Sequence, residues 1–269
     1  MGKRNLLFRA LLDFIMIAIL ATLYNKNMIS MMYHEVVGLA IVALFLLHLW
    51  FNRTWIAGMI RGMGARAKTP RVRFVIALDV LLTLVWVAVI VTGVLVSKKL
   101  FSFGLVWLNP WHFFCAALSL IVTGVHFGMH WDLFWGWIGK GIRLPRAIGI
   151  VLTIAVFCFG GYRVVTSSFS RWLTAPWSAA GHHHHETVRT ADPHATNAQA
   201  IVEDSSHSHG GGHGRGMGRG RQPLTLSRFV DVCATNVSIL FFFAILAWGA
   251  DVWFKKRSLR ALAASSRTP

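Results

Sequence analysis

The chain has 269 residues, of which 55% are hydrophobic and only 14% charged, and its mean hydropathy is +0.55. This composition excludes an ordinary soluble domain, because apolar runs of about 20 residues are typical of helices that cross a bilayer. The formal net charge of +17 does not indicate nucleic-acid binding. The basic residues gather at the ends of the apolar runs, where membrane proteins carry them on the cytoplasmic side.

Six apolar runs predict membrane-spanning helices, at about residues 6–24, 32–51, 74–96, 111–130, 147–166 and 229–254. Basic residues number 3, 6, 3 and 5 in the segments 1–9, 52–73, 140–146 and 255–269, but only 1 and 2 in the segments 25–31 and 97–110. The positive-inside rule therefore places both termini in the cytoplasm. We expect an all-α, multi-pass membrane helix bundle of about six transmembrane helices in a bacterial cytoplasmic membrane.

The first four predicted spans form two similar pairs, at about residues 6–56 and 74–137. Each pair opens with a Phe and, five residues later, an Asp, and its second helix carries two histidines fourteen residues apart. The residues concerned are Asp13, His34 and His48 in the first pair and Asp79, His112 and His126 in the second. Since each copy contains two spans, both copies enter the membrane in the same direction. The pattern predicts a duplicated two-helix repeat whose two histidine helices run parallel.

The histidine spacing predicts two facing pairs, one toward each side of the membrane. Fourteen residues make about four helical turns, so the two histidines of one helix share a face, about 21 Å apart along its axis. We expect His34 to face His112 near the outer surface and His48 to face His126 toward the inner surface. Opposed imidazoles suit the axial positions of a haem iron. The alternative is that each histidine hydrogen-bonds separately to a neighbouring helix.

Two such levels predict two haems stacked across the membrane. The haems should be of the non-covalent b type, because the sequence has no C-x-x-C-H attachment motif. Glycines near the histidines would let a flat macrocycle approach the backbone. Gly38 lies on the face of His34, and Gly124 and Gly128 flank His126. The alternative for these glycines is an ordinary contact between membrane helices.

Other polar residues in these spans have two interpretations each. His130 follows His126 by four residues, and its counterpart in the first copy is Asn52. We interpret His130 as an interfacial residue that bonds a haem propionate or a quinone. The alternative is a metal site shared with His126, because two histidines four residues apart on a helix can hold a metal. We interpret Asp13 and Asp79 as anchors of their helices, with Asp13 paired to Arg9, and proton uptake is the alternative.

The rest of the chain predicts three further segments: a fifth span within 138–166, a disordered outer loop at 167–228, and a sixth span with a basic cytoplasmic tail at 229–269. The loop is rich in Gly, Ser, His and Arg, a composition typical of disorder. Its histidines are His182, His183, His184, His185, His194, His207, His209 and His213. Neutral imidazoles bind Zn, Cu and Ni, so loose capture of such a metal or of Fe is one interpretation of the loop. A solvated linker is the other.

The first half of the chain, about residues 6–137, resembles the flavinylation-associated cytochrome family. The motifs behind the resemblance are Asp13, His34, His48, Asn52 and Trp55, and then Asp79, His112, His126, His130 and Trp131. The histidine spacing is also similar to that of respiratory cytochrome b. The resemblance implies a di-haem b-type cytochrome with the four paired histidines as ligands. It also implies electron transfer between a quinol or cytoplasmic-side donor and an extracytoplasmic flavin-binding protein, which we expect to be a separate chain.

The competing function is a His-rich divalent metal transporter or metal-sensing membrane protein. A transporter should place carboxylates beside its midplane histidines to balance a divalent ion. Glu35 lies near the predicted outer edge, and Asp13 and Asp79 lie near the inner edge. We therefore expect an electron carrier, a component of a membrane oxidoreductase, with a flavin or a metal ion as its outer acceptor.

Overall fold

The computed structural model describes residues 3–24, 30–66, 70–132, 145–178 and 225–265. This described part is all-helical. Its principal elements are α1 (Lys3–Leu23), α2 (Met31–Arg66), α3 (Pro70–Val96), the short 3-10 helix η1 (Val106–Leu108), α4 (Asn109–Met129), α6 (Arg146–Thr166) and α8 (Leu226–Ser265). The expected all-α class is therefore observed.

Five helical stretches in the described residues are long and apolar enough to cross a membrane. They are Met31–Gly58, Pro70–Val96, Val106–Met129, Ala147–Ser178 and Leu226–Arg257. The chain is therefore an integral, multi-pass membrane protein. The first predicted span is present as α1 but is not among these five, so a total of six spans stays a prediction.

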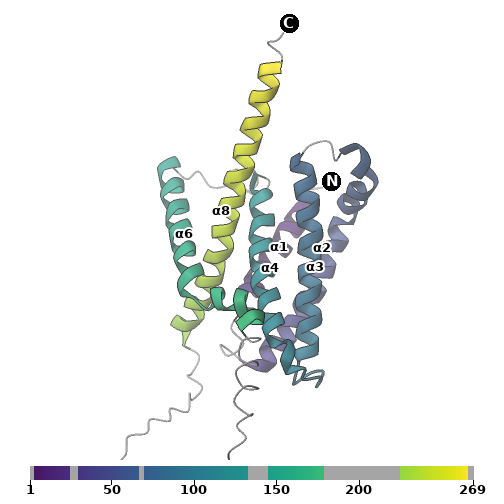
Figure 1. The fold of residues 1–269 in the computed structure, drawn as a ribbon, viewed down its shortest axis with the longest axis vertical. Helices are drawn as coiled ribbons and strands as arrows, with labels where there is room; N and C mark the ends of the chain where they lie inside the picture. The colour runs from purple at the N-terminus through teal and green to yellow at the C-terminus, as the bar shows by residue number, and fades with distance from the viewer. Residues whose placement is uncertain (1–2, 25–29, 67–69, 133–144, 179–224, 266–269) are drawn as a thin grey trace, which may run out of the picture.

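The helices stand side by side, and successive ones run in opposite directions (Figure 1). Both chain termini lie at the same end of the bundle, which we call the terminal end. The opposite end, the loop end, carries the connection from α3 through η1 to α4. α4 packs against α8 and α3, and α8 also contacts α6 and α1. The histidine helices α2 and α4 both run from the loop end to the terminal end, as the repeat predicts.

The centre of the bundle lies where α4 meets α8. Ala117 and Leu120 of α4 are 0% and 1% exposed, and Ile239 and Leu240 of α8 are 0% and 1% exposed. Large apolar side chains elsewhere face outward, among them Val165 at 75% exposure. In a bilayer the lipid is the solvent, so such outward apolar residues need no protein partner.

Glycines allow α4 and α8 to approach closely. A Cβ atom at Gly124 would lie 2.6 Å from the Leu240 carbonyl oxygen, and one at Gly128 would lie closer still to the Ala244 carbonyl oxygen. These carbonyls belong to the facing helix and cannot rotate away. Gly124 and Gly128 thus serve a helix contact, and their interpretation as residues that admit a macrocycle is wrong.

The prediction of a disordered loop at 167–228 is wrong at the start of that segment, because residues 169–178 form a helix. Phe169 is only 1% exposed, and Trp172 and Leu173 pack against the same core cluster. Their i, i+3, i+4 spacing is that of a helix with one apolar face, which the polar composition of the longer segment conceals. The loop histidines His182 to His213 lie outside the described residues.

Gly128→Ala should destabilise the bundle, because the new methyl group would collide with the backbone of α8. Overpacking of this kind costs about 1–3 kcal/mol, and the thermal unfolding midpoint in detergent should fall. Gly149→Ala in α6 is the matched control, because a Cβ atom there meets nothing within 4 Å. An unchanged midpoint for Gly128→Ala would contradict the close α4–α8 contact.

Candidate cofactor site

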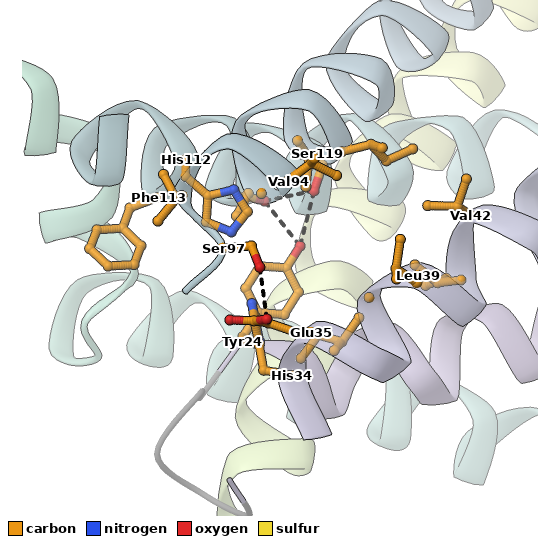
Figure 2. A pocket seen from close by; sticks show the side chains of 18 of the residues that line it. Tyr24, His34, Glu35, Leu39, Val42, Val94, Ser97, His112, Phe113 and Ser119 are labelled. Carbon is orange, nitrogen blue, oxygen red and sulfur yellow. Dashed lines mark hydrogen bonds between the residues drawn. The ribbon is translucent and has the colours of Figure 1, made fainter. Parts of the chain in front are cut away.

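His34 of α2 and His112 of α4 meet near the loop end of the bundle. Their ring centroids are 6.2 Å apart and their planes are nearly perpendicular, at 87°. Figure 2 shows both side chains directed into one pocket. The juxtaposition expected at the outer level is therefore present, although 78 residues of sequence separate the two histidines (112 − 34).

Both histidines line one pocket with mostly apolar walls. The lining comes from α1 to α4 and the 169–178 helix, and the empty space of about 1250 Å³ includes open solvent at the mouth. One wall is a stack of Tyr24 on Trp172, with centroids 5.9 Å apart and planes at 18°. Gly38 lines the pocket as predicted, and a Cβ atom there would meet nothing within 4 Å. Apolar side chains and open space at Gly38 therefore lie beside both imidazoles.

The imidazole of His112 is held in place by α3. Its Nδ1 lies 3.1 Å from the Thr92 hydroxyl oxygen, and that hydroxyl donates its own proton to the Ala88 carbonyl at 2.7 Å. Thr92 therefore accepts a hydrogen bond from Nδ1–H, which leaves Nε2 as the nitrogen able to bind a metal. Gly93 makes room for the ring, because a Cβ atom there would lie 3.2 Å from Cε1 of His112. Sequence reasoning missed both Thr92 and Gly93.

Glu35, next to His34, closes the loop end of the pocket. Its carboxylate accepts hydrogen bonds from the Ser97 hydroxyl at 2.8 Å and from backbone amides, including that of Leu100 at 2.9 Å and that of Lys98 at 3.2 Å. The carboxylate thus ties α2 to the segment after α3 (Figure 2). The sequence placed Glu35 near the outer edge but gave no sign of these partners.

The histidines toward the terminal end are each bound to an aspartate on the preceding helix. His48 Nδ1 lies 2.7 Å from Asp13 Oδ1, and His126 Nδ1 lies 2.8 Å from Asp79 Oδ1. The same atoms meet in both helix pairs. The predicted pairing of Asp13 with Arg9 is wrong, because Arg9 donates to the Phe51 carbonyl instead. The aspartates do connect neighbouring helices, but they do so through the histidines.

This arrangement prepares a histidine to bind a metal. A carboxylate that accepts a hydrogen bond from one ring nitrogen fixes the ring and makes the other nitrogen a stronger ligand. Such support is frequent behind metal-bound histidines. In the described residues, His48 and His126 each bond to an aspartate. That the two imidazoles face each other across the bundle stays a prediction.

A buried aromatic pair lies between the two levels. Phe45 precedes His48 on α2, and Trp86 lies on α3 between Asp79 and Gly93. Their rings stack with centroids 5.5 Å apart and planes at 7°, and they are 8% and 6% exposed. Trp86 also lines the pocket. Along α2 and α3 the pair lies between the pocket residues near the loop end and the Asp–His pairs toward the terminal end.

His130 lies beside His126, with ring centroids 4.7 Å apart. One ligand atom each from Asp79, His126 and His130 lies within 4.8 Å of the others, a spacing that could hold a metal ion. Asn52, the counterpart of His130, donates to the His48 carbonyl at 3.0 Å. His130 therefore lies beside His126 toward the terminal end, as the alternative of an i, i+4 histidine pair predicts. Its bond to a haem propionate or a quinone stays a prediction.

Comparisons with protein-family models, curated proteins and solved structures found no match. The resemblance to the flavinylation-associated cytochromes therefore depends on the motifs in the sequence. The geometry of the histidines has to carry any functional conclusion.

Glu35→Gln should loosen the segment at the loop end, because hydrogen bonds to a charged acceptor contribute about 1.5–3 kcal/mol. We expect the amides of Lys98 and Leu100 to exchange with deuterium about tenfold faster, measured by mass spectrometry or NMR. The amides of Gly104 and Leu105 are internal controls, because they donate to the backbone carbonyls of Ser97 and Leu95. Equal protection of Lys98 and Leu100 in both proteins would contradict the role of the carboxylate.

Proposed function

We propose that this protein is a b-type membrane cytochrome that passes electrons across the membrane. The observation that carries the proposal is the pair His34 and His112. Their ring centroids are 6.2 Å apart, and both side chains line one mostly apolar pocket at the loop end. The donor would be a quinol or a carrier at the terminal end. The acceptor would be a flavin-binding protein or a metal ion at the loop end.

The outer residues fit a haem on distance, shape and chemistry. A bond from an imidazole nitrogen to a metal is about 2.0–2.1 Å long, as known for zinc. Two such bonds, plus the short distance from each nitrogen to its ring centre, place the centroids of two axial imidazoles about 6 Å apart. The observed separation is 6.2 Å. The apolar walls and the open space at Gly38 suit a macrocycle.

When bound, a haem supplies a one-electron carrier whose potential the protein can adjust. His34 and His112 would hold the outer haem, with His112 oriented by Thr92. His48 and His126 would hold the inner haem, and Asp13 and Asp79 would orient them. The stacked rings of Phe45 and Trp86 would keep water from the space between the levels. Duplication of the Asp–His pair supports two equivalent ligands at the inner level.

We infer the orientation of the protein in the membrane from the distribution of Lys and Arg. The terminal end carries the end of α2, the start of α3 and the end of α8, which are rich in Lys and Arg, so it would face the cytoplasm of a bacterial cell. The outer pocket would then open toward the extracytoplasmic side. A flavin-binding partner would be a separate chain that approaches the loop end.

One observation favours a second candidate, the divalent metal transporter or sensor. Asp79, His126 and His130 form a set of two histidines and one carboxylate, which suits iron, zinc or a similar metal. A metal ion held there would occupy His126 and prevent it from serving a haem. The outer pocket would have no role in this candidate.

Purified protein made with ample haem should contain about two b-type haems per chain, all extractable with acidified acetone. His34→Ala or His112→Ala should remove one haem, and His48→Ala or His126→Ala should remove the other. The pyridine haemochrome assay gives the stoichiometry. Folded wild-type protein without a Soret band would contradict the proposal.

His130→Ala separates the two candidates. In the cytochrome the variant should keep both haems, because His130 is not a predicted axial ligand. In the metal candidate it should lose most of its bound zinc or iron, measured by mass spectrometry of the metal content. Loss of a haem from His130→Ala, with both haems retained in His126→Ala, would contradict the ligand assignment.

The protein in liposomes, with reductant trapped inside and an impermeant ferric acceptor outside, should reduce the acceptor. His48→Ala should be slower by at least about tenfold while its outer haem remains, because the inner stage of the relay is lost. The test is the initial rate of acceptor reduction, normalised to the vesicles in which the terminal end faces inward. Equal rates for wild type, His48→Ala and empty liposomes would contradict electron transfer.

A further inference from the structure

The two histidine levels differ in the groups behind their imidazoles. Toward the terminal end, both His48 and His126 bond to carboxylates, at 2.7 and 2.8 Å. At the loop end, His112 bonds to the neutral hydroxyl of Thr92 at 3.1 Å. Distances of about 2.7–2.9 Å are typical of an N–H donor and an ionised acceptor. The inner histidines are therefore held by charge-assisted hydrogen bonds.

A carboxylate changes the imidazole as a ligand. It draws the Nδ1 proton toward itself, so Nε2 becomes more electron-rich and binds the oxidised, more positive iron more strongly. Hydrogen bonding behind an axial ligand is one of the means by which a protein sets a haem potential. Two carboxylates, one behind each ligand, would act on the same iron.

We propose that Asp13 and Asp79 are positioning residues that give the inner haem a lower reduction potential than the outer haem. This inference depends on the proposed function. With both haems bound, one electron from the reduced inner iron, which would become ferric, would reduce the ferric outer iron. This internal step would be downhill from the terminal end to the loop end.

The exposure of the two aspartates predicts that they lower the reduction potential of the inner haem by different amounts. The Asp79 side chain is 13% exposed, while that of Asp13 is 48% exposed. Charges act more strongly where less solvent screens them, so Asp79 should contribute more.

Other charges near the terminal end are an ion-paired group and Arg9, whose guanidinium donates to the Phe51 carbonyl. Asp251 pairs with both Arg71 and Lys255, and Lys255 also pairs with Asp132, so this group near the terminal end contains two cations and two anions. At the loop end the carboxylate of Glu35 accepts hydrogen bonds from Ser97 and from backbone amides, which partly neutralise its field.

The test is a spectroelectrochemical titration of the full chain with both haems bound. Asp79→Asn keeps the shape of the side chain but removes its charge. At a fixed ambient potential we expect the reduced-to-oxidised ratio of the inner haem to rise about tenfold, which for one electron is a shift of about 59 mV. Asp13→Asn should give a smaller rise. Asp231→Asn, which removes a carboxylate paired with Arg163 on the far side of the bundle, should change neither haem.

His34→Ala assigns the two components, because it should leave only the inner haem. That haem should titrate at the lower of the two wild-type potentials. If Asp79→Asn fails to hold its inner haem, this comparison still decides the order. The proposal is overturned if His34→Ala keeps the higher-potential component, or if Asp79→Asn keeps both haems at unchanged potentials. Protein without any haem would instead overturn the proposed function.

Discussion

A hydrogen bond between an imidazole and a carboxylate on the neighbouring helix organises the terminal half of this bundle. A polar side chain among apolar helices is unfavourable without a partner, and Asp13 and Asp79 supply that partner to His48 and His126. Each bond joins two consecutive helices and fixes the direction of one imidazole. The same bond therefore stabilises the fold and orients a potential ligand, so its two effects need separate measurements.

The half of the bundle toward the loop end is built around a pocket. There the helices leave a pocket between His34 and His112, and the supports of the pocket are a neutral hydroxyl, Thr92, and a carboxylate, Glu35, held by a turn of backbone amides. The stacked rings of Phe45 and Trp86 lie between the two halves along α2 and α3. In the proposed cytochrome, the two halves would give the two haems different hydrogen-bond partners.

The group of Asp79, His126 and His130 is where the two candidate functions diverge. In the proposed cytochrome, Asp79 would orient His126 through Nδ1, and Nε2 would be the ligand atom. In a metal site, Asp79, His126 and His130 would hold one ion. The duplication favours the first, because the other helix pair has Asn52 where this one has His130, yet keeps the same Asp–His bond.

The sequence by itself determined the helical class, the membrane character and the meeting of His34 with His112. Hydrophobic length and a spacing of fourteen residues are local properties, and helix geometry converts them directly into spans and shared faces. The tertiary structure decided the partners of those residues. Asp13 could bond to Arg9 within its own helix, and Gly124 and Gly128 could face a cofactor or a helix. Only the packing of α1 on α2, α3 on α4 and α4 on α8 selected among these alternatives, because such contacts join residues that are distant along the chain.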